Sequence, residues 1–110
     1  MAGWYELDKN DKGQHSFVLK AANGEVILRS ELYDSRAGAD NGIASVQKNS
    51  LVDTAYTHSD ASDGRFYFNL KAANHQVIGT SQMYKTVTAR HAGMESVRVN
   101  GPTTVIKHPG

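Results

Sequence analysis

Short apolar runs with period-two alternation come in pairs along the chain, and each pair precedes a helical pattern. The first pair occupies residues 15–22 and 25–31 and is joined by Asn23-Gly24. Asn-Gly between such runs is a strong signal for a hairpin with a two-residue type I′ turn. In that register Ala22 lies opposite Glu25, and every second residue shares a face. We therefore expect an antiparallel hairpin with one core face and one open face.

The predicted register divides the side chains of this hairpin and of its later counterpart between the two faces. The aromatic and aliphatic set is expected in the core: Phe17, Leu19, Ala21, Val26, Leu28, Ser30, Phe66, Phe68, Leu70, Ala72 and Val77. The mixed set is expected on the open sheet face: Val18, Lys20, Ala22, Ile27, Arg29, Tyr67, Asn69, Lys71, Ile78 and Thr80.

A helix is expected after each hairpin, over residues 36–49 and 87–100. Ser35 and Thr86 precede these ranges and are good N-caps, because their hydroxyls accept from unpaired N–H groups. Apolar residues recur at helical spacing on one stripe of each helix. The stripes contain Ala39, Ile43, Val46 and Ser50 in the first helix, and Val87, Arg90, Met94 and Val97 in the second.

The chain repeats itself, and the repeat organises the fold. Residues 17–50 align without a gap with residues 68–101. Identical pairs include Phe17/Phe68, Leu19/Leu70, Lys20/Lys71, Asn23/Asn74, Ile27/Ile78, Tyr33/Tyr84, Gly42/Gly93, Ser45/Ser96, Val46/Val97 and Asn49/Asn100. The duplicated helix glycines suggest a close helix–sheet approach, and the asparagines are expected helix stops. Further strands are expected over 3–8, 53–58 and 103–107.

These elements give the order βββα-βββα-β and an α+β fold. We expect one mainly antiparallel sheet with two helices on one face and an internal pseudo-twofold axis. Length predicts a single domain, residues 1–110, with repeats over about 3–52 and 53–107. The second hairpin has Asn74-His75 where the first has Asn23-Gly24. Because His tolerates a positive φ less well than Gly, that turn is expected to be more strained or longer.

The phrase LKAANGEVI at residues 19–27 returns as LKAANHQVI at residues 70–78. With the Ser-x-x-Tyr segment and the Ser-Val-x-x-Asn helix end that follow it, the phrase resembles the YegP-like family of uncharacterised small bacterial proteins. The resemblance implies two β3-α-β units in one sheet, with the last strand of each exchanged into the other. It implies no activity, cofactor or catalytic residue. The departures at His75, Gln76, Arg90 and His91 argue against two identical sites.

Composition and charge narrow the function classes. Lys and Arg number 12 and Asp and Glu number 11, so the basic excess usual in nucleic-acid binders is absent. The sequence has no cysteine, which excludes disulfides, thiolate metal sites and a Cys nucleophile. No secretory signal or membrane-spanning apolar run is visible in the sequence. These features predict a cytoplasmic protein without a membrane partner.

Neither a metal site nor a catalytic constellation emerges from residue spacing. The five histidines are far apart in sequence, without the spacing of a zinc site. Ser45 and Ser96 are expected to pack helices rather than act as nucleophiles. The pairs Asp8/Asp11 and Asp60/Asp63 lie in polar turns, where Asp is favoured for backbone hydrogen bonding. We therefore predict no cofactor, no metal and no enzymatic activity.

The open sheet face is the predicted functional surface. Its candidate binding residues are Val18, Lys20, Ile27, Arg29, Tyr67, Lys71 and Ile78. Apolar side chains on an exposed face favour a protein partner or self-association. Single-stranded nucleic acid is the alternative, because cations beside an aromatic ring can hold bases and phosphates. An uncharacterised enzyme is the third possibility. Trp4 is expected either on this face or over the rim of the core.

Overall fold

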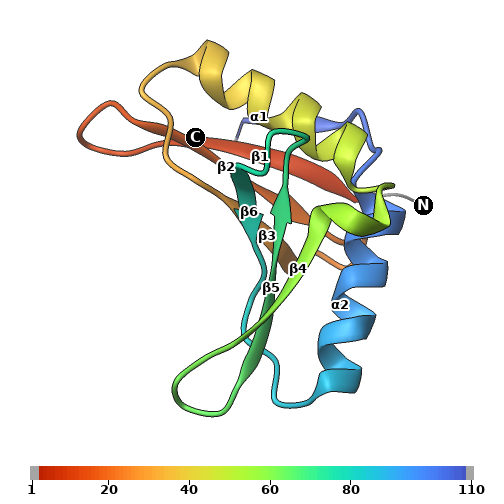
Figure 1. Cartoon of the computed structure of the whole chain (residues 1–110). Helices are drawn as coiled ribbons and strands as arrows, with labels where there is room; N and C mark the ends of the chain where they lie inside the picture. The colour runs from red at the N-terminus through yellow and green to blue at the C-terminus, as the bar shows by residue number, and fades with distance from the viewer. Residues whose placement is uncertain (1–2, 109–110) are drawn as a thin grey trace.

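The structure, a computed structural model, describes residues 3–108 and contains one seven-stranded sheet with two helices (Figure 1). The strands are β1 (Trp4–Lys9), β2 (His15–Lys20), β3 (Val26–Ser30), β4 (Tyr56–Asp60), β5 (Phe66–Lys71), β6 (Val77–Thr80) and β7 (Ile106–Lys107). The helices are α1 (Arg36–Asn49), the short 3-10 helix η1 (Asp53–Ala55) and α2 (Val87–Asn100). The strand order is β4-β5-β6-β3-β2-β1-β7. The predicted α+β class and repeat architecture are confirmed.

The two repeats are interleaved within this sheet. Strands β3 and β6 pair antiparallel at its centre and join the repeats, with Arg29 opposite Thr80. Strand β7, from the end of the second repeat, pairs in parallel with β1 of the first. The expected strand over 53–58 begins later, at Tyr56, because residues 53–55 form η1 and Tyr56 N–H donates to Asp53 O. The chain thus passes directly from α1 through η1 into β4.

The core lies between one face of the sheet and both helices. Its largest fully buried side chains come from both repeats: Tyr5, Phe17, Phe68, Leu19, Leu28, Ile43, Leu70, Val46 and Val97. Phe17 stacks on Tyr33 with ring centroids 6.2 Å apart, and Phe68 stacks on Tyr84 at 6.4 Å. The duplicated aromatic residues therefore form duplicated pairs.

Both helices have the predicted bounds and caps. Ser35 Oγ accepts from Gly38 N–H and Thr86 Oγ1 accepts from Ala89 N–H, each at 3.0 Å. Asn49 and Asn100 are the last helical residues, and their amides donate back to the carbonyls of Ser45 and Ser96. The predicted stripes are buried except at Val87, which is 54% exposed. This residue is the first of α2, directly after the N-cap, and precedes the part of the helix that meets the core.

Both hairpin loops are one residue longer than predicted, and this difference changes which face of the sheet some side chains occupy. Ala21, not Ala22, pairs with Glu25, and Gly24 N–H donates to Ala21 O, so the loop has three residues. Only Gly24 then needs a positive φ, here 86°. The predicted register holds as far as Leu19 opposite Leu28 and is then shifted by a bulge, which places Lys20 opposite Val26. The β5–β6 hairpin has the same bulge and the same loop length.

The second turn is strained rather than longer. His75 occupies the position of Gly24 and has a φ of 69°, in the left-handed region that glycine adopts most easily. The expectation of strain at Asn74-His75 is therefore confirmed, and the alternative of a longer loop is wrong. The hairpin keeps its geometry at the expense of an unfavourable backbone conformation at one residue.

Candidate functional site

The open sheet face keeps five of its seven predicted binding residues. Val18, Lys20, Arg29, Tyr67 and Lys71 lie on it by strand register. Ile27 and Ile78 do not, because the bulges turn both side chains into the core, where they are 3% and 7% exposed. Val26 and Val77, predicted in the core, lie opposite Lys20 and Lys71 instead. The aliphatic content of the face therefore comes mainly from valines.

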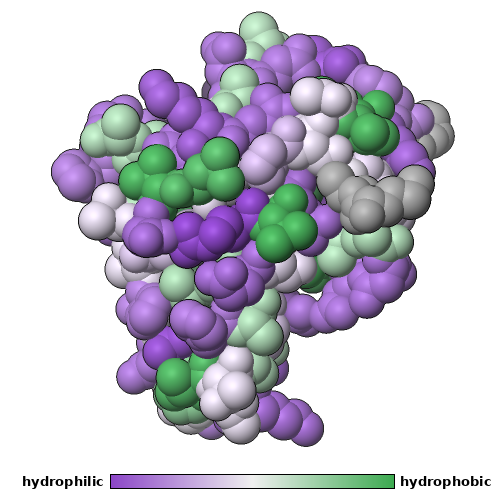
Figure 2. All heavy atoms as spheres, turned by 90° about the vertical axis from the view of Figure 1, so that its right-hand side faces the viewer, coloured by the Kyte–Doolittle hydropathy of each residue, from purple (hydrophilic) through white to green (hydrophobic). Residues whose placement is uncertain are grey.

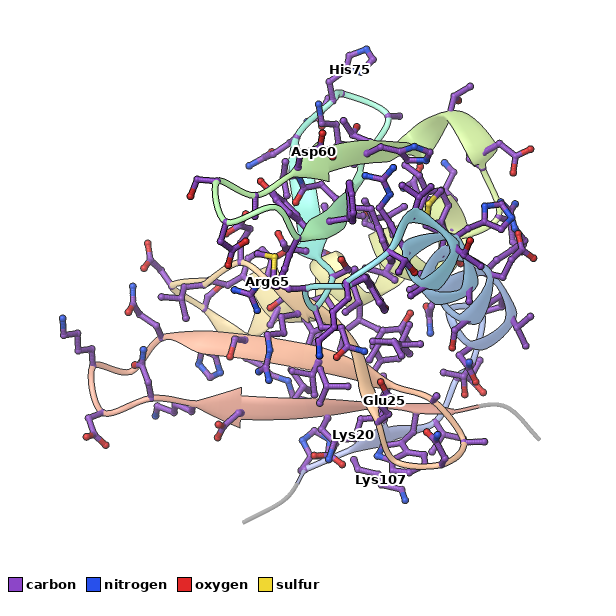
Figure 3. All side chains as sticks on the ribbon, turned by 90° about the horizontal axis from the view of Figure 1, so that it is seen from below. Lys20, Glu25, Asp60, Arg65, His75 and Lys107 are labelled. Carbon is purple, nitrogen blue, oxygen red and sulfur yellow. The ribbon has the colours of Figure 1, made fainter. Side chains whose placement is uncertain are left out.

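Lys20 lies at the β1 end of this face in a compact polar cluster. Its Nζ is 3.0 Å from Glu6 Oε2, and Trp4 Nε1 donates to the same carboxylate at 2.7 Å. These two interactions, that of Trp4 first, hold the pKa of the Glu6 carboxyl below its usual range. Lys20 and Lys107 are labelled near each other in Figure 3. Lys107 Nζ lies 4.1 Å from the centre of the Trp4 ring. Trp4 is thus on the open face, with one side of its ring already covered.

Lys71 has the equivalent position in the second repeat but a different environment. Thr57 stands where the first repeat has Glu6, so the carboxylate that neutralises Lys20 has no counterpart. Within residues 3–108, Lys71 makes no ion pair. Two lysines that are identical in the repeat are therefore electrostatically different.

Two equivalent grooves lie between the repeats, on the helix side of the sheet. The first groove, of about 260 Å³, runs between the β2–β3 hairpin and α2, and the second, of about 290 Å³, runs between the β5–β6 hairpin and α1. Each is therefore formed by the hairpin of one repeat and the helix of the other. Six equivalent pairs of identical residues line them: Ala21/Ala72, Asn23/Asn74, Ile27/Ile78, Tyr84/Tyr33, Gly93/Gly42 and Ser96/Ser45.

Each groove also contains one glutamate and one glutamine, beside the asparagines of its lining. In the first groove Glu25 accepts a hydrogen bond from Gln82 Nε2 at 2.6 Å. In the second groove the positions are exchanged, with Gln76 on the hairpin and Glu31 on the opposite wall. Among the described residues, neither groove is lined by Lys, Arg or His. Both grooves therefore present one negative charge.

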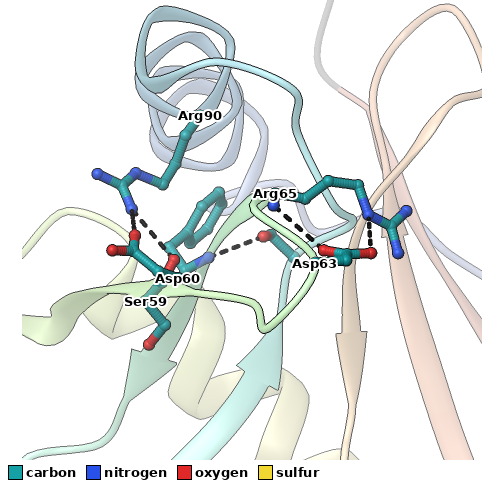
Figure 4. A network of polar contacts seen from close by, with 7 residues as sticks. Ser59, Asp60, Asp63, Arg65 and Arg90 are labelled. Atoms are coloured by element: carbon teal, nitrogen blue, oxygen red, sulfur yellow. Dashed lines mark hydrogen bonds and ion pairs between the residues drawn. The ribbon is translucent and has the colours of Figure 1, made fainter.

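Arg90, which departs from Ala39 of the first repeat, has a structural role. Its side chain is buried, and Nη1 donates to Ser59 O at 3.1 Å and lies 3.4 Å from Asp60 Oδ1 (Figure 4). The guanidinium lies 5.3 Å from the centre of the Phe66 ring. Arg90 thus attaches α2 to the edge strand β4.

Of the acidic pairs considered for acid–base chemistry, Asp60/Asp63 is engaged in a similar way. Asp60 contacts Arg90, and Asp63 accepts from the backbone and side chain of Arg65. The backbone N–H of Arg65 is the main reason that the pKa of Asp63 lies below its usual range. In the described chain no three His, Asp or Glu side chains gather as metal ligands. No helix of residues 3–108 is long and apolar enough to span a membrane.

Exposed apolar side chains are dispersed rather than concentrated. On the face seen in Figure 2 they form small separate patches among hydrophilic residues. The largest exposed fractions belong to Val99, Leu32, Leu51, Val87 and Val105. Leu32 lines the second groove, and Met83, its equivalent, is 40% exposed.

Comparison with known proteins places the chain in a family. The family model described as "Domain of unknown function (DUF1508)" matches residues 10–56 and again residues 61–107. The chain belongs to the DUF1508 family. The UPF0339 protein YegP of Escherichia coli O6:H1 is 58% identical over 107 residues, and a UPF0339 protein of Shewanella oneidensis is 59% identical over 107 residues. Each alignment covers 97% of both chains.

Two solution NMR structures of DUF1508 relatives have the same fold. That of YegP from E. coli, titled a protein of unknown function, has a TM-score of 0.93 at 56% identity and covers 98% of this chain and 93% of its own. That of a UPF0339 protein from S. oneidensis has a TM-score of 0.93 at 58% identity and covers 98% and 92%. The names of these relatives assign no function and no catalytic activity. The resemblance predicted from the repeated phrase is confirmed.

The two DUF1508 matches show which elements form one unit. Residues 10–56 contain β2, β3, α1 and η1, and residues 61–107 contain β5, β6, α2 and β7. Each groove described above therefore forms between two DUF1508 units. Sequence reasoning assigned the doubled phrase to a hairpin and missed its second role as a groove wall. The sequence did contain a signal for the grooves, because Glu25 and Glu31 of the first repeat are replaced by Gln76 and Gln82 in the second. This pattern gives each groove one glutamate and one glutamine.

Proposed function

We propose that this DUF1508 protein is a non-catalytic binding protein that accepts a basic side chain of a protein partner in each of its two grooves. One observation carries the proposal. Each groove combines the hairpin of one repeat with the helix of the other, and the two grooves present the same residue types, including one glutamate and one glutamine each. Folding explains the hairpin turn and the helix glycine, but it does not require a glutamate and a glutamine in each groove.

The charge and lining of each groove suit a lysine or arginine side chain. Glu25 in the first groove and Glu31 in the second supply the negative charge. Ile27 or Ile78 and neighbouring alanines supply an apolar wall, against which the aliphatic stem of a basic side chain can pack. The hydrogen bond from Gln82 leaves other acceptor positions free on the Glu25 carboxylate.

Two equivalent grooves on one domain favour a bivalent partner. A partner with two suitably spaced basic residues would gain from the second contact without a further loss of translational freedom. This interpretation moves the expected protein partner from the open sheet face to the grooves. Binding of a protein or of single-stranded nucleic acid across the open sheet face stays a prediction.

The test is a titration of the ¹⁵N-labelled chain with Nα-acetyl-lysine methylamide, followed by amide chemical shifts. We expect saturable shifts at residues of both grooves. The norleucine analogue, which has the same stem without the charge, should bind more weakly. A Glu25→Gln/Glu31→Gln double variant replaces the carboxylate of each groove by a carboxamide and should lose the lysine-dependent shifts. Both glutamates are exposed, so the fold should be retained.

The matched control is Glu95→Gln, which removes an exposed acid outside both grooves. It should leave the titration unchanged. Equal binding of the lysine and norleucine probes would remove the electrostatic basis of the proposal. Unchanged shifts in the double variant would remove the grooves as the site.

A further inference from the structure

A basic pocket lies next to the β5–β6 hairpin, and the charged residues that line it differ from those at the equivalent positions of the other repeat. It measures about 320 Å³ and lies between the end of α1, the η1 segment and the hairpin. Lys48 and Lys71 supply its positive charge, and His75 and Thr54 add polar groups, whereas the amide of Asn49 already donates to Ser45 O. In the part of the chain that the structure describes, no acidic side chain lines it. This pocket shares Ala72 with the second groove, but its polar residues and the ligand inferred for it differ from those of the grooves.

The basic character results from coordinated departures from the repeat. Lys48 replaces Val99 and His75 replaces Gly24, so two polar groups are added at equivalent positions. Thr57 replaces Glu6, so the acid that neutralises Lys20 is absent beside Lys71. Compared with the surroundings of Lys20, those of Lys71 have thus gained donors and lost an acceptor.

The space in the pocket depends on a fourth departure. Ala55 replaces Trp4, whose indole in the first repeat lies beside Lys20 and is held by Glu6 and Lys107. The bulk that accompanies Lys20 is therefore missing beside Lys71. Figure 3 shows Lys20 and Lys107 together, far from His75 at the tip of the other hairpin.

The backbone conformation of His75 indicates that this residue is present for a reason other than the stability of the fold. A glycine would adopt the φ of 69° at this turn without steric cost, as Gly24 does at 86°. Residues held in such conformations concentrate at functional sites. Lys48 alone would indicate little, because a cation at the C-terminal end of a helix is favourable by itself. The positive φ of His75 and the absence of an acidic partner for Lys71 among the described residues are not explained by a favourable contact with a helix end.

We propose that this pocket binds a small organic anion with a phosphate or carboxylate head group. Lys48 and Lys71 contact the head group, and His75 and Thr54 donate hydrogen bonds to it. Val52, Ala55 and Ala72 form the apolar wall for the body of the ligand. The volume is at the lower end of the range for small-molecule sites.

The experiment titrates the intact ¹⁵N-labelled chain with phenyl phosphate, benzoate, inorganic phosphate and the neutral benzyl alcohol. We expect saturable shifts at the pocket with the anions and none with the alcohol. Phenyl phosphate against benzoate identifies the head group that is preferred. Lys71→Met keeps the stem and removes the charge, and it should weaken binding about tenfold or more. Lys20→Met, at the equivalent position, should have no effect.

Two further variants separate the pocket from folding. His75→Gly should weaken anion binding while raising the thermal midpoint, a combination that a purely structural histidine would not produce. Ala55→Trp should abolish binding by restoring the bulk found beside Lys20, and His75→Gly remains informative if that variant fails to fold.

Three results would overturn the proposal. They are equal binding of benzyl alcohol, equal losses in Lys71→Met and Lys20→Met, and no saturable shift with any anion. An oligothymidylate that binds across the open sheet face without competition from phenyl phosphate would assign Lys71 to a nucleic-acid surface instead.

Discussion

Two tyrosine hydroxyls close the C-terminal ends of the helices. Tyr5 Oη donates to Gly101 O at 2.6 Å, and Tyr56 Oη donates to Ser50 O at 2.7 Å. These carbonyls follow the helices, where backbone acceptors lack partners within the helix. Burial raises the pKa of Tyr5 above its ordinary value and is the main cause that raises the pKa of Tyr56 to about 12. Both hydroxyls are therefore held in the protonated form.

The raised pKa values predict a loss of stability in alkali. A group whose pKa is higher in the folded state contributes stability below its unfolded pKa, about 10 for tyrosine, and loses it as pH rises through the folded value. The free energy of unfolding, measured by urea titration at a series of pH values from neutral upward, should change little up to about pH 10 and then fall.

A Tyr5→Phe/Tyr56→Phe double variant checks this cause. Each substitution should cost about 1 kcal/mol at neutral pH, because a helix-end carbonyl loses its donor. The alkaline decline should also become shallower. Tyr67→Phe on the open face is the neutral-pH control. An unchanged alkaline decline in the double variant would assign it to other groups.

At the scale of elements, glycine permits each helix to lie close to a tyrosine. A Cβ on Gly42 would lie 2.5 Å from Tyr33 Oη and 2.9 Å from Phe17 Cε2. Gly93 meets Tyr84 in the same way. The stacked pairs Phe17–Tyr33 and Phe68–Tyr84 thus fill the space that a helix side chain would otherwise take.

Gly42→Ala should therefore destabilise the protein although alanine is the better helix former. The intrinsic gain is about 1 kcal/mol, whereas overpacking typically costs about 1–3 kcal/mol. Gly38→Ala in the same helix is the control, since its nearest neighbours would be 3.3–3.4 Å away. Adding Tyr33→Phe should recover part of the loss. Urea midpoints measure all three, and a stabilised Gly42→Ala variant would contradict the close approach.

How far the sequence predicts these elements depends on what decides each one. The helix bounds, Ser35, Thr86 and the duplicated glycines follow from local signals that packing reinforces. Ile27 and Ile78 were misplaced because Asn-Gly fits both a two-residue turn and a three-residue loop. His75 carried the missing information. A two-residue type I′ turn needs a positive φ at both loop residues, whereas the three-residue loop needs it at one, which a sequence without glycine tolerates more easily. The environments of Lys71 and of the grooves join residues distant in sequence, so only the folded chain reveals them.

At the scale of the molecule, each repeat completes the other. Tyr5, in β1 of the first repeat, contacts the end of α2. Tyr56, in β4 of the second repeat, contacts the end of α1. Gly3 N–H donates to Asn100 Oδ1 at 2.7 Å, and Thr103 Oγ1 donates to Gly3 O at 2.8 Å. With β3–β6 and β1–β7 pairing, these contacts give no plane along which the repeats could separate.

We therefore predict a single cooperative unfolding transition. The fluorescence of Trp4, the single tryptophan of the sequence, reports on the first repeat. Far-UV circular dichroism reports on both helices. The two urea curves should coincide, and Tyr56→Phe in the second repeat should shift both midpoints equally. A fluorescence midpoint that stays in place while the dichroism midpoint moves would show that the repeats unfold separately.

The matching tyrosine contacts have a consequence for how such a chain could arise. The opening strand of each repeat supplies a tyrosine hydroxyl to the end of the helix in the other repeat. A half-length protein with one such strand, one hairpin and one helix would therefore leave the carbonyl at its own helix end without this donor. Two copies of it, related by a twofold axis, would satisfy both. A symmetric homodimer of a single unit, fused after gene duplication, would reproduce the present architecture. In such a fused chain the two hairpins would be free to differ at positions such as 24 and 75.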